Sequence, residues 1–487
     1  MSDLVMTFSE YADYDALGLA ELVRRKEVTP EELAQLAQAA VERLNPQLNA
    51  VIEVWPDRVE RCDPDADLNR PFAGVPFLLK DIGAAEKGRP QEMGSRLCKG
   101  RLSPFTTELT KKFKKAGLNI MGRTTCPDNA FTFDSESQLH GATHNPWKPG
   151  FIAGGSSSGA ASAVAAGILP MAHASDGAGS TRMPASICGL VGLKPSRGRL
   201  SLAPIADEHT FMEAVEGVVS RTVRDTAVLF DHISGSEVGE FMHAAPPKRP
   251  YAEELRDPQK YRIAVSLEPW GAYRAKPHLL AEVEKTAGLL TGLGHEVVEA
   301  TPPIDFERFF EAFTLNWIGS TLTLEMQAEE MGVQLSTDHL EPVLFEHVVR
   351  AREISLRRWM EKDHTIMAIT RELDDFFREN RIDLVLTPVM AIDTPELGNS
   401  YSLSHTGMTL DEWMDNLWQA IPYTPLANAT GVPAISLPLA REGNGLPLGM
   451  QFFGRWGSED KLLNLAAQLE AAQPWITQVP PVHVSKL

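Results

Sequence analysis

The sequence contains few cysteines, and their spacing excludes several kinds of site. Its 487 residues include four, at Cys62, Cys98, Cys126 and Cys188. These positions form neither a C-x-x-C pair nor a zinc-ligand pattern. A chain of this length does not need disulfides for stability, because its core buries roughly three quarters of the unfolded surface. We therefore expect reduced, partly buried thiols, as in a cytoplasmic protein.

Basic residues and long apolar runs are also scarce. The sequence has 46 Lys and Arg against 65 Asp and Glu, which gives a formal net charge of −19. Binding to a nucleic-acid backbone needs a clustered basic surface, so no nucleic-acid partner is expected. The most apolar stretch, residues 160–174, contains Pro170 and is too short to span a bilayer. No basic segment precedes an apolar run near Met1, so no secretory signal is predicted. These absences predict a soluble protein without a membrane partner.

What the sequence does contain is the composition of a globular protein and an alternation of helix and strand patterns. Hydrophobic residues make up 43% and charged residues 23%, close to globular averages. Residues 15–45 predict two helices, with Thr29, Pro30 and Glu32 at the start of the second. Further helices are expected over 106–116 and 278–293, and strands over 118–121, 262–266, 295–298, 383–386, 434–437 and 448–453. The alternation predicts an α/β fold with a central mixed, mainly parallel twisted sheet and helices on both faces.

No shift in composition marks a domain boundary, so residues 1–487 are predicted to form a single large domain. Within it, residues 1–70 are an N-terminal helical segment and residues 71–200 hold the unusual motifs. Residues 201–487 supply the rest of the α/β core and the pocket segments. The Asn444-Gly445 pair predicts a hairpin between the last two strands.

Glycine and serine are concentrated in residues 154–159 and 176–182. Glycines at this density suit loops whose backbone N–H groups converge on an anion. Ser180 is then a candidate nucleophile, and the N–H groups of residues 177–180 are candidate donors to an oxyanion. The alternative is an ordinary tight turn, because glycine and serine dominate turns.

A serine nucleophile needs a base. None of the 13 histidines lies in a revealing motif, and His173 is expected to be a packed loop histidine. His140 and His144 have helical spacing but lie in a predicted loop without an H-E-x-x-H pattern, so no metal is expected. Lys80 ends an apolar, strand-like run, where burial would lower its pKa and make it a neutral base. The alternative is a solvated lysine paired with Asp81.

Taken in order, these motifs resemble those of the amidase signature family of Ser–Ser–Lys hydrolases. The matching segments are Gly74-Val75-Pro76, Lys80-Asp81, Gly154–Gly159, Asp176–Arg182, Pro184-Ala185-Ser186 and Gly189–Pro195. Looser similarity extends over nearly the whole chain. Within the family, residues 71–76, 185–189 and 194–199 are most similar to the 6-aminohexanoate cyclic dimer hydrolases.

The resemblance implies an amide hydrolase that works through an acyl-enzyme. It assigns Ser180 as the nucleophile, Lys80 as the base and Ser156 as the bridging serine that follows a non-prolyl cis peptide. It places the oxyanion hole at Gly177, Ala178, Gly179 and Ser180, with alanine where many members have glycine. It also implies that Asp176 and Arg182 brace this loop through an ion pair.

The substrate is less specified than the chemistry. In the family, variable segments build the pocket, and here the candidates are residues 93–102, 131–133 and 309–323. Trp317 and Phe131 are the candidate wall residues, although Trp317 also fits the core of a helix beside Phe313. The substrate would be a small-molecule amide such as a linear or cyclic amide, an anilide or a carbamate, with no cofactor or metal. Homodimers are frequent among relatives.

Two other functions remain open. One is the glutaminase subunit of an amidotransferase that converts Glu-tRNA to Gln-tRNA, which would need partner subunits. The other is a non-catalytic binding protein on the same scaffold. The intact Lys80, Ser156 and Ser180 argue against the second.

Overall fold

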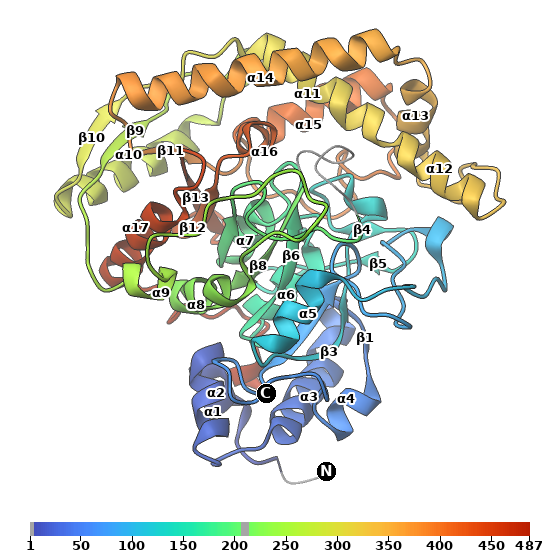
Figure 1. Cartoon of the computed structure of the whole chain (residues 1–487), viewed down its shortest axis with the longest axis vertical. Coiled ribbons are helices and arrows are strands. Elements are labelled where there is room, and N and C mark those ends of the chain that lie inside the picture. Colours follow the sequence, from blue (N-terminus) through green and yellow to red (C-terminus); the bar gives the residue numbers. More distant parts are fainter. Residues whose placement is uncertain (1–3, 206–213) are drawn as a thin grey trace.

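A mixed sheet of eight strands forms the centre of the protein (Figure 1). The computed structural model describes residues 4–205 and 214–487. In this part of the chain the strand order is β10-β9-β11-β13-β12-β7-β8-β6. These strands are β6 Met171–Asp176, β7 Val191–Lys194, β8 Val215–Ser220, β9 Arg262–Val265, β10 Glu296–Glu299, β11 Leu384–Pro388, β12 Ala434–Arg441 and β13 Pro447–Gly454.

Two smaller sheets and the helices surround this centre. The strands are β1 Val51–Val54, β2 Pro76–Lys80, β3 Asn119–Thr124, β4 Glu136–Ser137 and β5 Gly141–Ala142. The helices of the first half are α1 Phe8–Asp13, α2 Ala16–Arg24, α3 Pro30–Leu48, α4 Pro56–Glu60, α5 Glu108–Lys115, α6 Ser158–Ala165, α7 Arg182–Cys188 and α8 Val223–Ile233. Those of the second half are α9 Tyr251–Glu254, α10 Pro277–Gly292, α11 Phe306–Ser320, α12 Leu322–Glu330, α13 Pro342–Ala351, α14 Leu356–Glu379, α15 Leu410–Ala420, α16 Pro425–Thr430 and α17 Glu459–Ala472.

The sheet is mixed, as expected, but its parallel pairs are the minority rather than the predicted majority. Among the described strands, β9 pairs in parallel with β10 and β11. The other five neighbouring pairs are antiparallel. Within the eight-stranded sheet, the strand–helix–strand pattern that predicted parallel pairing occurs at β9, α10 and β10. The other such unit, β2, α5 and β3, forms a parallel pair in the three-stranded sheet. The hairpin at Asn444-Gly445 joins β12 to β13 and so makes that pair antiparallel.

Helices cover both faces of the sheet, and glycines on β13 let them approach closely. A Cβ at Gly449 would lie 2.6 Å from Ser186 Cβ of α7. Gly454 lies five residues further along the same strand and therefore faces the opposite side. A Cβ there would lie close to the hydroxyl of Ser458, the residue just before α17. Helices α7 and α17 therefore pack on opposite faces.

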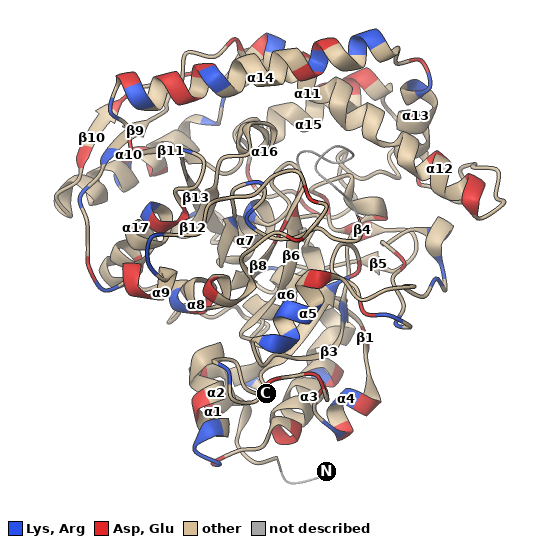
Figure 2. Cartoon of the chain, in the orientation of Figure 1, with Lys and Arg blue, Asp and Glu red and all other residues tan. Residues whose placement is uncertain are grey.

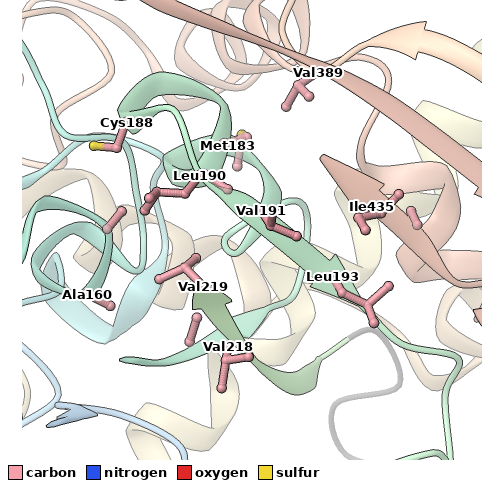
Figure 3. Close-up of a cluster of buried hydrophobic side chains, with 14 of the residues drawn as sticks. Ala160, Met183, Cys188, Leu190, Val191, Leu193, Val218, Val219, Val389 and Ile435 are labelled. Carbon is pink, nitrogen blue, oxygen red and sulfur yellow. The ribbon is translucent and has the colours of Figure 1, made fainter. Parts of the chain in front are cut away.

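The middle of the sheet is an apolar core (Figure 3). Val191 and Leu193 of β7, Val218 and Val219 of β8, and Ile435 of β12 have no exposed surface. Each such side chain contributes about 1.5–3 kcal/mol through burial. This core holds β6 and α7, the elements on either side of the glycine-rich loop 176–182.

The N-terminal region follows the sequence pattern closely. Helix α3 begins with a capping box, in which the Thr29 hydroxyl accepts from the Glu32 N–H at 3.2 Å and the Glu32 carboxylate accepts from the Thr29 N–H at 2.7 Å. The three-stranded sheet β1-β3-β2 lies beside the main sheet, and β2 contacts β6. Strand β2 is fully buried and ends at Lys80. Strand β6 ends at Asp176, where the second glycine-rich loop begins.

Charged residues of both signs are distributed over the outer helices, as Figure 2 shows along α14. Within residues 4–205 and 214–487, no helix has both the length and the apolar character that crossing a bilayer requires.

Candidate active site

Lys80 is buried against two serine hydroxyls at the end of β2. It is 1% exposed, and its Nζ donates to Ser156 Oγ at 2.7 Å and to Ser175 Oγ at 2.9 Å. The alternative of a solvated lysine paired with Asp81 is wrong, because the Asp81 carboxylate accepts from Arg123 Nη1 at 2.6 Å instead. Lys80 therefore points into the interior, toward the serines.

The environment of Lys80 favours its neutral form more than water does. Burial lowers the pKa of Lys80 to about 8, while Cys126, Glu216 and Asp176 act in the opposite direction. With a pKa near 8, Lys80 is neutral in about a tenth of the molecules at pH 7. A hydroxyl can both accept and donate, so Ser156 can serve either protonation state of the lysine.

Ser156 lies in the first glycine-rich loop, just before α6. The Gly155–Ser156 peptide bond is cis, as the family resemblance implied. The next residue joins the two loops, because the Ser157 N–H donates to the Ser180 carbonyl at 3.3 Å and Ser157 Oγ accepts from the Ser175 N–H at 3.3 Å. Both Ser156 and Ser180 are nearly buried, with 1% and 5% exposure.

The second loop is wrapped around the carboxylate of Asp176. This carboxylate accepts from the Gly179 N–H at 2.7 Å and from the Thr181 N–H at 3.2 Å. It also forms the expected ion pair with Arg182, at 2.9 Å and with both side chains buried. Burial alone would raise the pKa of Asp176, but Arg182 and the hydrogen bonds hold it well below its usual range.

The hydrogen bonds of the 176–182 loop reduce the number of backbone N–H groups that are available to an oxyanion. The Gly179 N–H is already donated to Asp176, so it is not available to a substrate in this arrangement. The N–H groups of Gly177, Ala178 and Ser180 donate to no other residue in the described part of the chain. Ala178 has no left-handed backbone angle, so its Cβ causes no strain there. Three of the four predicted donors thus remain.

A cavity of about 190 Å³ opens over Ser156 and Ser180. Phe131 and Trp317 form part of its wall, and their rings meet edge to face with centroids 5.0 Å apart. The ring centroid of Trp317 also lies 6.3 Å from that of Phe313. Trp317 therefore both lines the cavity and packs within the helix, as the two alternatives for this residue expected. None of the described lining residues comes from segment 93–102.

Two residues of the site have no local motif in the sequence. His173 lies on β6 rather than in a loop, and its Nδ1 accepts from the Lys80 N–H at 3.1 Å. Its Nε2 lies 2.6 Å from Glu216 Oε2, and Glu216 lines the cavity. Glu216 reaches this place because β8 pairs with β6 in a register that sets it opposite Ser175. This register, which brings Glu216 to the cavity, has no local pattern in the sequence from which it could be predicted.

Two further residues connect the cavity to the outer helices. One, Asn316, lies in the candidate pocket segment 309–323 without having been singled out there, and the other, Lys362, was not predicted. Asn316 of α11 lines the cavity, and its Oδ1 accepts from Nζ of Lys362 on α14 at 2.7 Å. Lys362 is 4% exposed and also lies over the Trp359 ring, 3.7 Å from its centroid. The lysine bonds the oxygen of the Asn316 amide, whereas the NH₂ group donates to no residue among 4–205 and 214–487.

One cluster of potential metal ligands lies nearby. Ligand atoms of Asp81, Glu92 and His140 lie within 4.8 Å of one another. The Arg123 guanidinium, however, bonds Asp81 at 2.6 Å and Glu92 at 2.7 Å. An arginine that neutralises both carboxylates disfavours a cation there. His144 is not part of this cluster.

Comparison with known proteins shows the family to which the chain belongs. The sequence pattern of the Amidase family matches residues 32–463. The 6-aminohexanoate-cyclic-dimer hydrolase of Paenarthrobacter ureafaciens is 34% identical over 476 residues, which cover 96% of each chain. A solved structure of 6-aminohexanoate cyclic dimer hydrolase superposes with a TM-score of 0.91 at 33% identity, covering 97% of this chain and 99% of the other. A bacterial aryl acylamidase superposes with a TM-score of 0.82 at 26% identity, covering 95% and 97%. The chain therefore belongs to the amidase family and has the fold of the amidase signature enzymes.

Proposed function

We propose that this amidase cleaves its substrate through an acyl-enzyme on Ser180, with Ser156 and Lys80 as a proton relay. The observation that carries the proposal is the 2.7 Å hydrogen bond from Lys80 Nζ to Ser156 Oγ, at the base of a cavity that Ser180 also lines. A buried lysine with a lowered pKa is suited to accept a proton near neutral pH.

In the acylation step, neutral Lys80 accepts the proton of Ser156 while Ser156 takes the proton of Ser180. The Ser180 oxygen attacks the amide carbon and forms the new C–O bond. Negative charge develops on the carbonyl oxygen, where the N–H groups of Gly177, Ala178 and Ser180 can donate to it. A single such donor is worth about 3 kcal/mol in well-studied hydrolases.

Collapse of this intermediate breaks the C–N bond. The relay returns its proton, through Ser156, to the departing nitrogen, so that a neutral amine leaves. A water molecule then attacks the ester carbon, and the same relay takes the proton of the water. The bond between the Ser180 oxygen and the acyl carbon breaks as the relay returns this proton to the Ser180 oxygen. The products are a carboxylic acid and an amine, and Lys80 ends in its starting state.

The proposed substrates are small amides, including linear and cyclic amides, anilides and carbamates. The named relatives act on a cyclic amide dimer and on aryl acylamides. Apolar walls such as Ile82, Phe131 and Trp317 suit the hydrocarbon part of such molecules. We also propose a cytoplasmic location, since all four cysteines are buried and unpaired. A homodimer without nucleic-acid or membrane partners completes the proposal.

The experiment is a substrate panel with a matched variant. The purified chain is given a nitroanilide, an aliphatic amide, an aryl carbamate, a cyclic amide dimer and glutamine, beside Ser180→Ala. We expect turnover of at least one amide other than glutamine, and its loss in Ser180→Ala. Turnover of glutamine alone would favour the amidotransferase subunit, and no hydrolysis of any compound would favour a binding protein.

A further inference from the structure

A carboxylate lies in the wall of the catalytic cavity, although the proposed mechanism does not use it. Glu216 is 8% exposed, and it is the single charged side chain among the described lining residues. It reaches the cavity beside Gly83, where a Cβ would lie within 3 Å of both of its carboxylate oxygens. Glycine at position 83 therefore keeps space open in front of this carboxylate.

One oxygen of this carboxylate is occupied and the other is free. Because His173 Nδ1 accepts the Lys80 N–H, the ring hydrogen of neutral His173 is on Nε2 and is donated to Glu216 Oε2 at 2.6 Å. Oε1 accepts from no residue in the described part of the chain. A nearly buried carboxylate that lacks a second partner is costly unless a ligand satisfies it.

We propose that Glu216 binds a protonated amine of the substrate, so that the enzyme prefers amides carrying an ammonium group. This inference rests on the proposed amide hydrolysis. An ammonium supplies both the missing hydrogen bond and the compensating positive charge, whereas a neutral N–H supplies only the first. The apolar wall around Glu216 would accommodate the carbon chain between that ammonium and the amide.

Binding of an ammonium at Glu216 would also affect the protonation of Lys80, the base of the proposed proton relay. Glu216 favours the protonated form of Lys80 by its negative charge. A substrate ammonium at Glu216 offsets that charge, and Lys80 then releases its proton more readily. Binding of the preferred substrate would thus increase the fraction of lysine able to act as base.

A binding measurement tests the proposal without requiring turnover. Hexylammonium and its neutral counterpart 1-hexanol are titrated calorimetrically at pH 7 into the parent chain and into Glu216→Gln. We expect hexylammonium to bind the parent about tenfold or more tightly than 1-hexanol, as a charged hydrogen bond implies. In Glu216→Gln this ratio should fall to near one. Equal affinities in the parent, or an unchanged ratio in Glu216→Gln, would overturn the proposal.

Two further variants show whether the binding preference depends on the negative charge at position 216 or on a general effect of removing a carboxylate. Glu216→Asp keeps the charge and should retain part of the preference. Glu361→Gln changes an exposed carboxylate on α14 and should retain all of it. Loss of the ratio in Glu361→Gln would show that the effect is not specific to the cavity and would contradict the proposal.

A matched pair of substrates extends the test to catalysis. The 4-nitroanilides of 6-aminohexanoic acid and heptanoic acid differ in an ammonium against a methyl group, and the N-(5-aminopentyl) and N-hexyl benzamides differ likewise on the amine side. We expect the ammonium member of at least one pair to have the higher kcat/KM, with the ratio lost in Glu216→Gln. Ser180-dependent turnover without any such preference would leave the proposed function standing and overturn this inference. Glu216-dependent binding without turnover would do the reverse.

Discussion

A lysine side chain with almost no contact with water is destabilising unless its surroundings satisfy it. Lys80 meets this condition with two hydroxyls, Ser156 Oγ and Ser175 Oγ, rather than with a carboxylate. A salt bridge would hold the proton on the lysine, whereas hydroxyls leave it able to lose one. The choice of partners thus determines the chemistry available to this residue.

The first prediction is a pH dependence of catalysis. Burial lowers the pKa of Lys80 to about 8, and the proposed mechanism needs the neutral form. The value of kcat/KM for a nitroanilide should therefore rise about tenfold per pH unit below pH 8 and level off above it. The measurement is a pH–rate profile from pH 6 to 9.5. A profile that is flat across this range would contradict the role of Lys80 as base.

The second prediction concerns the ion pair inside the 176–182 loop. Asp176→Asn leaves Arg182 buried without its charged partner, which typically costs about 3–5 kcal/mol. We expect the free energy of unfolding in urea to fall by that order and amide hydrolysis to be lost. Glu361→Gln, in an exposed pair with Arg357, serves as the control and should leave the unfolding midpoint unchanged. Equal stability of both variants would contradict the bracing role of Asp176.

Individual residues differ in how far the sequence could identify them. Lys80, Ser156 and Ser180 lie in motifs that resemble the amidase signature, and this resemblance, rather than composition, implied that they lie close together. Glu216 could not be predicted in the same way, because no local pattern surrounds it. Asn316 lies in the candidate pocket segment 309–323, but no pattern distinguishes it from its neighbours there. Each reaches the cavity only through strand pairing or helix packing between distant segments.

At the scale of elements, a side chain of the outer helix α14 contacts a residue that lines the cavity over Ser156 and Ser180. Lys362 crosses from α14 to Asn316 of α11 and fixes which end of that amide is free. The free NH₂ group is then available as a donor to a second carbonyl of the substrate. An element far from the serines thereby contributes to the polarity of the pocket.

The third prediction follows from this contact. Lys362→Met removes the group that orients Asn316, so kcat/KM for substrates with a second carbonyl should fall by about tenfold relative to those without one. The measurement compares a cyclic amide dimer with a simple anilide. Arg357→Met changes an exposed residue of the same helix and should leave the ratio unchanged. A ratio that stays constant in Lys362→Met would argue against this role of the helix.

Helices and strands could be predicted where the local sequence contains a capping, turn or periodic apolar pattern. The capped helix α3, the unit formed by β9, α10 and β10, and the hairpin of β12 and β13 all match the sequence-based expectations. Strands β6 to β8 are buried almost throughout and rich in small residues, so they show no alternation of apolar and polar positions. The antiparallel pairing in this half of the sheet therefore could not be predicted.

At the scale of the whole molecule, the site is assembled from segments spread over much of the chain. The segment that follows β2, the two glycine-rich loops, β8 and α11 all contribute to one cavity. The match to the named hydrolase covers 96% of both sequences. We propose that the chain hydrolyses amides without a subunit of another kind.

The fourth prediction is that the purified chain is active alone. It should hydrolyse a nitroanilide or a cyclic amide at a rate proportional to its own concentration, with no added subunit. Sedimentation in the same buffer should give a homodimer of the chain. Activity that appears only after addition of another protein would contradict this account and favour the amidotransferase reading.

The acyl-enzyme on Ser180 is tested most directly by intact-mass spectrometry of the chain during turnover of a slowly deacylating aryl carbamate, followed by peptide mapping. We expect a mass increase equal to the acyl group, located on Ser180 and missing in Ser180→Ala. Turnover without any covalent adduct, or an adduct on another residue, would contradict it.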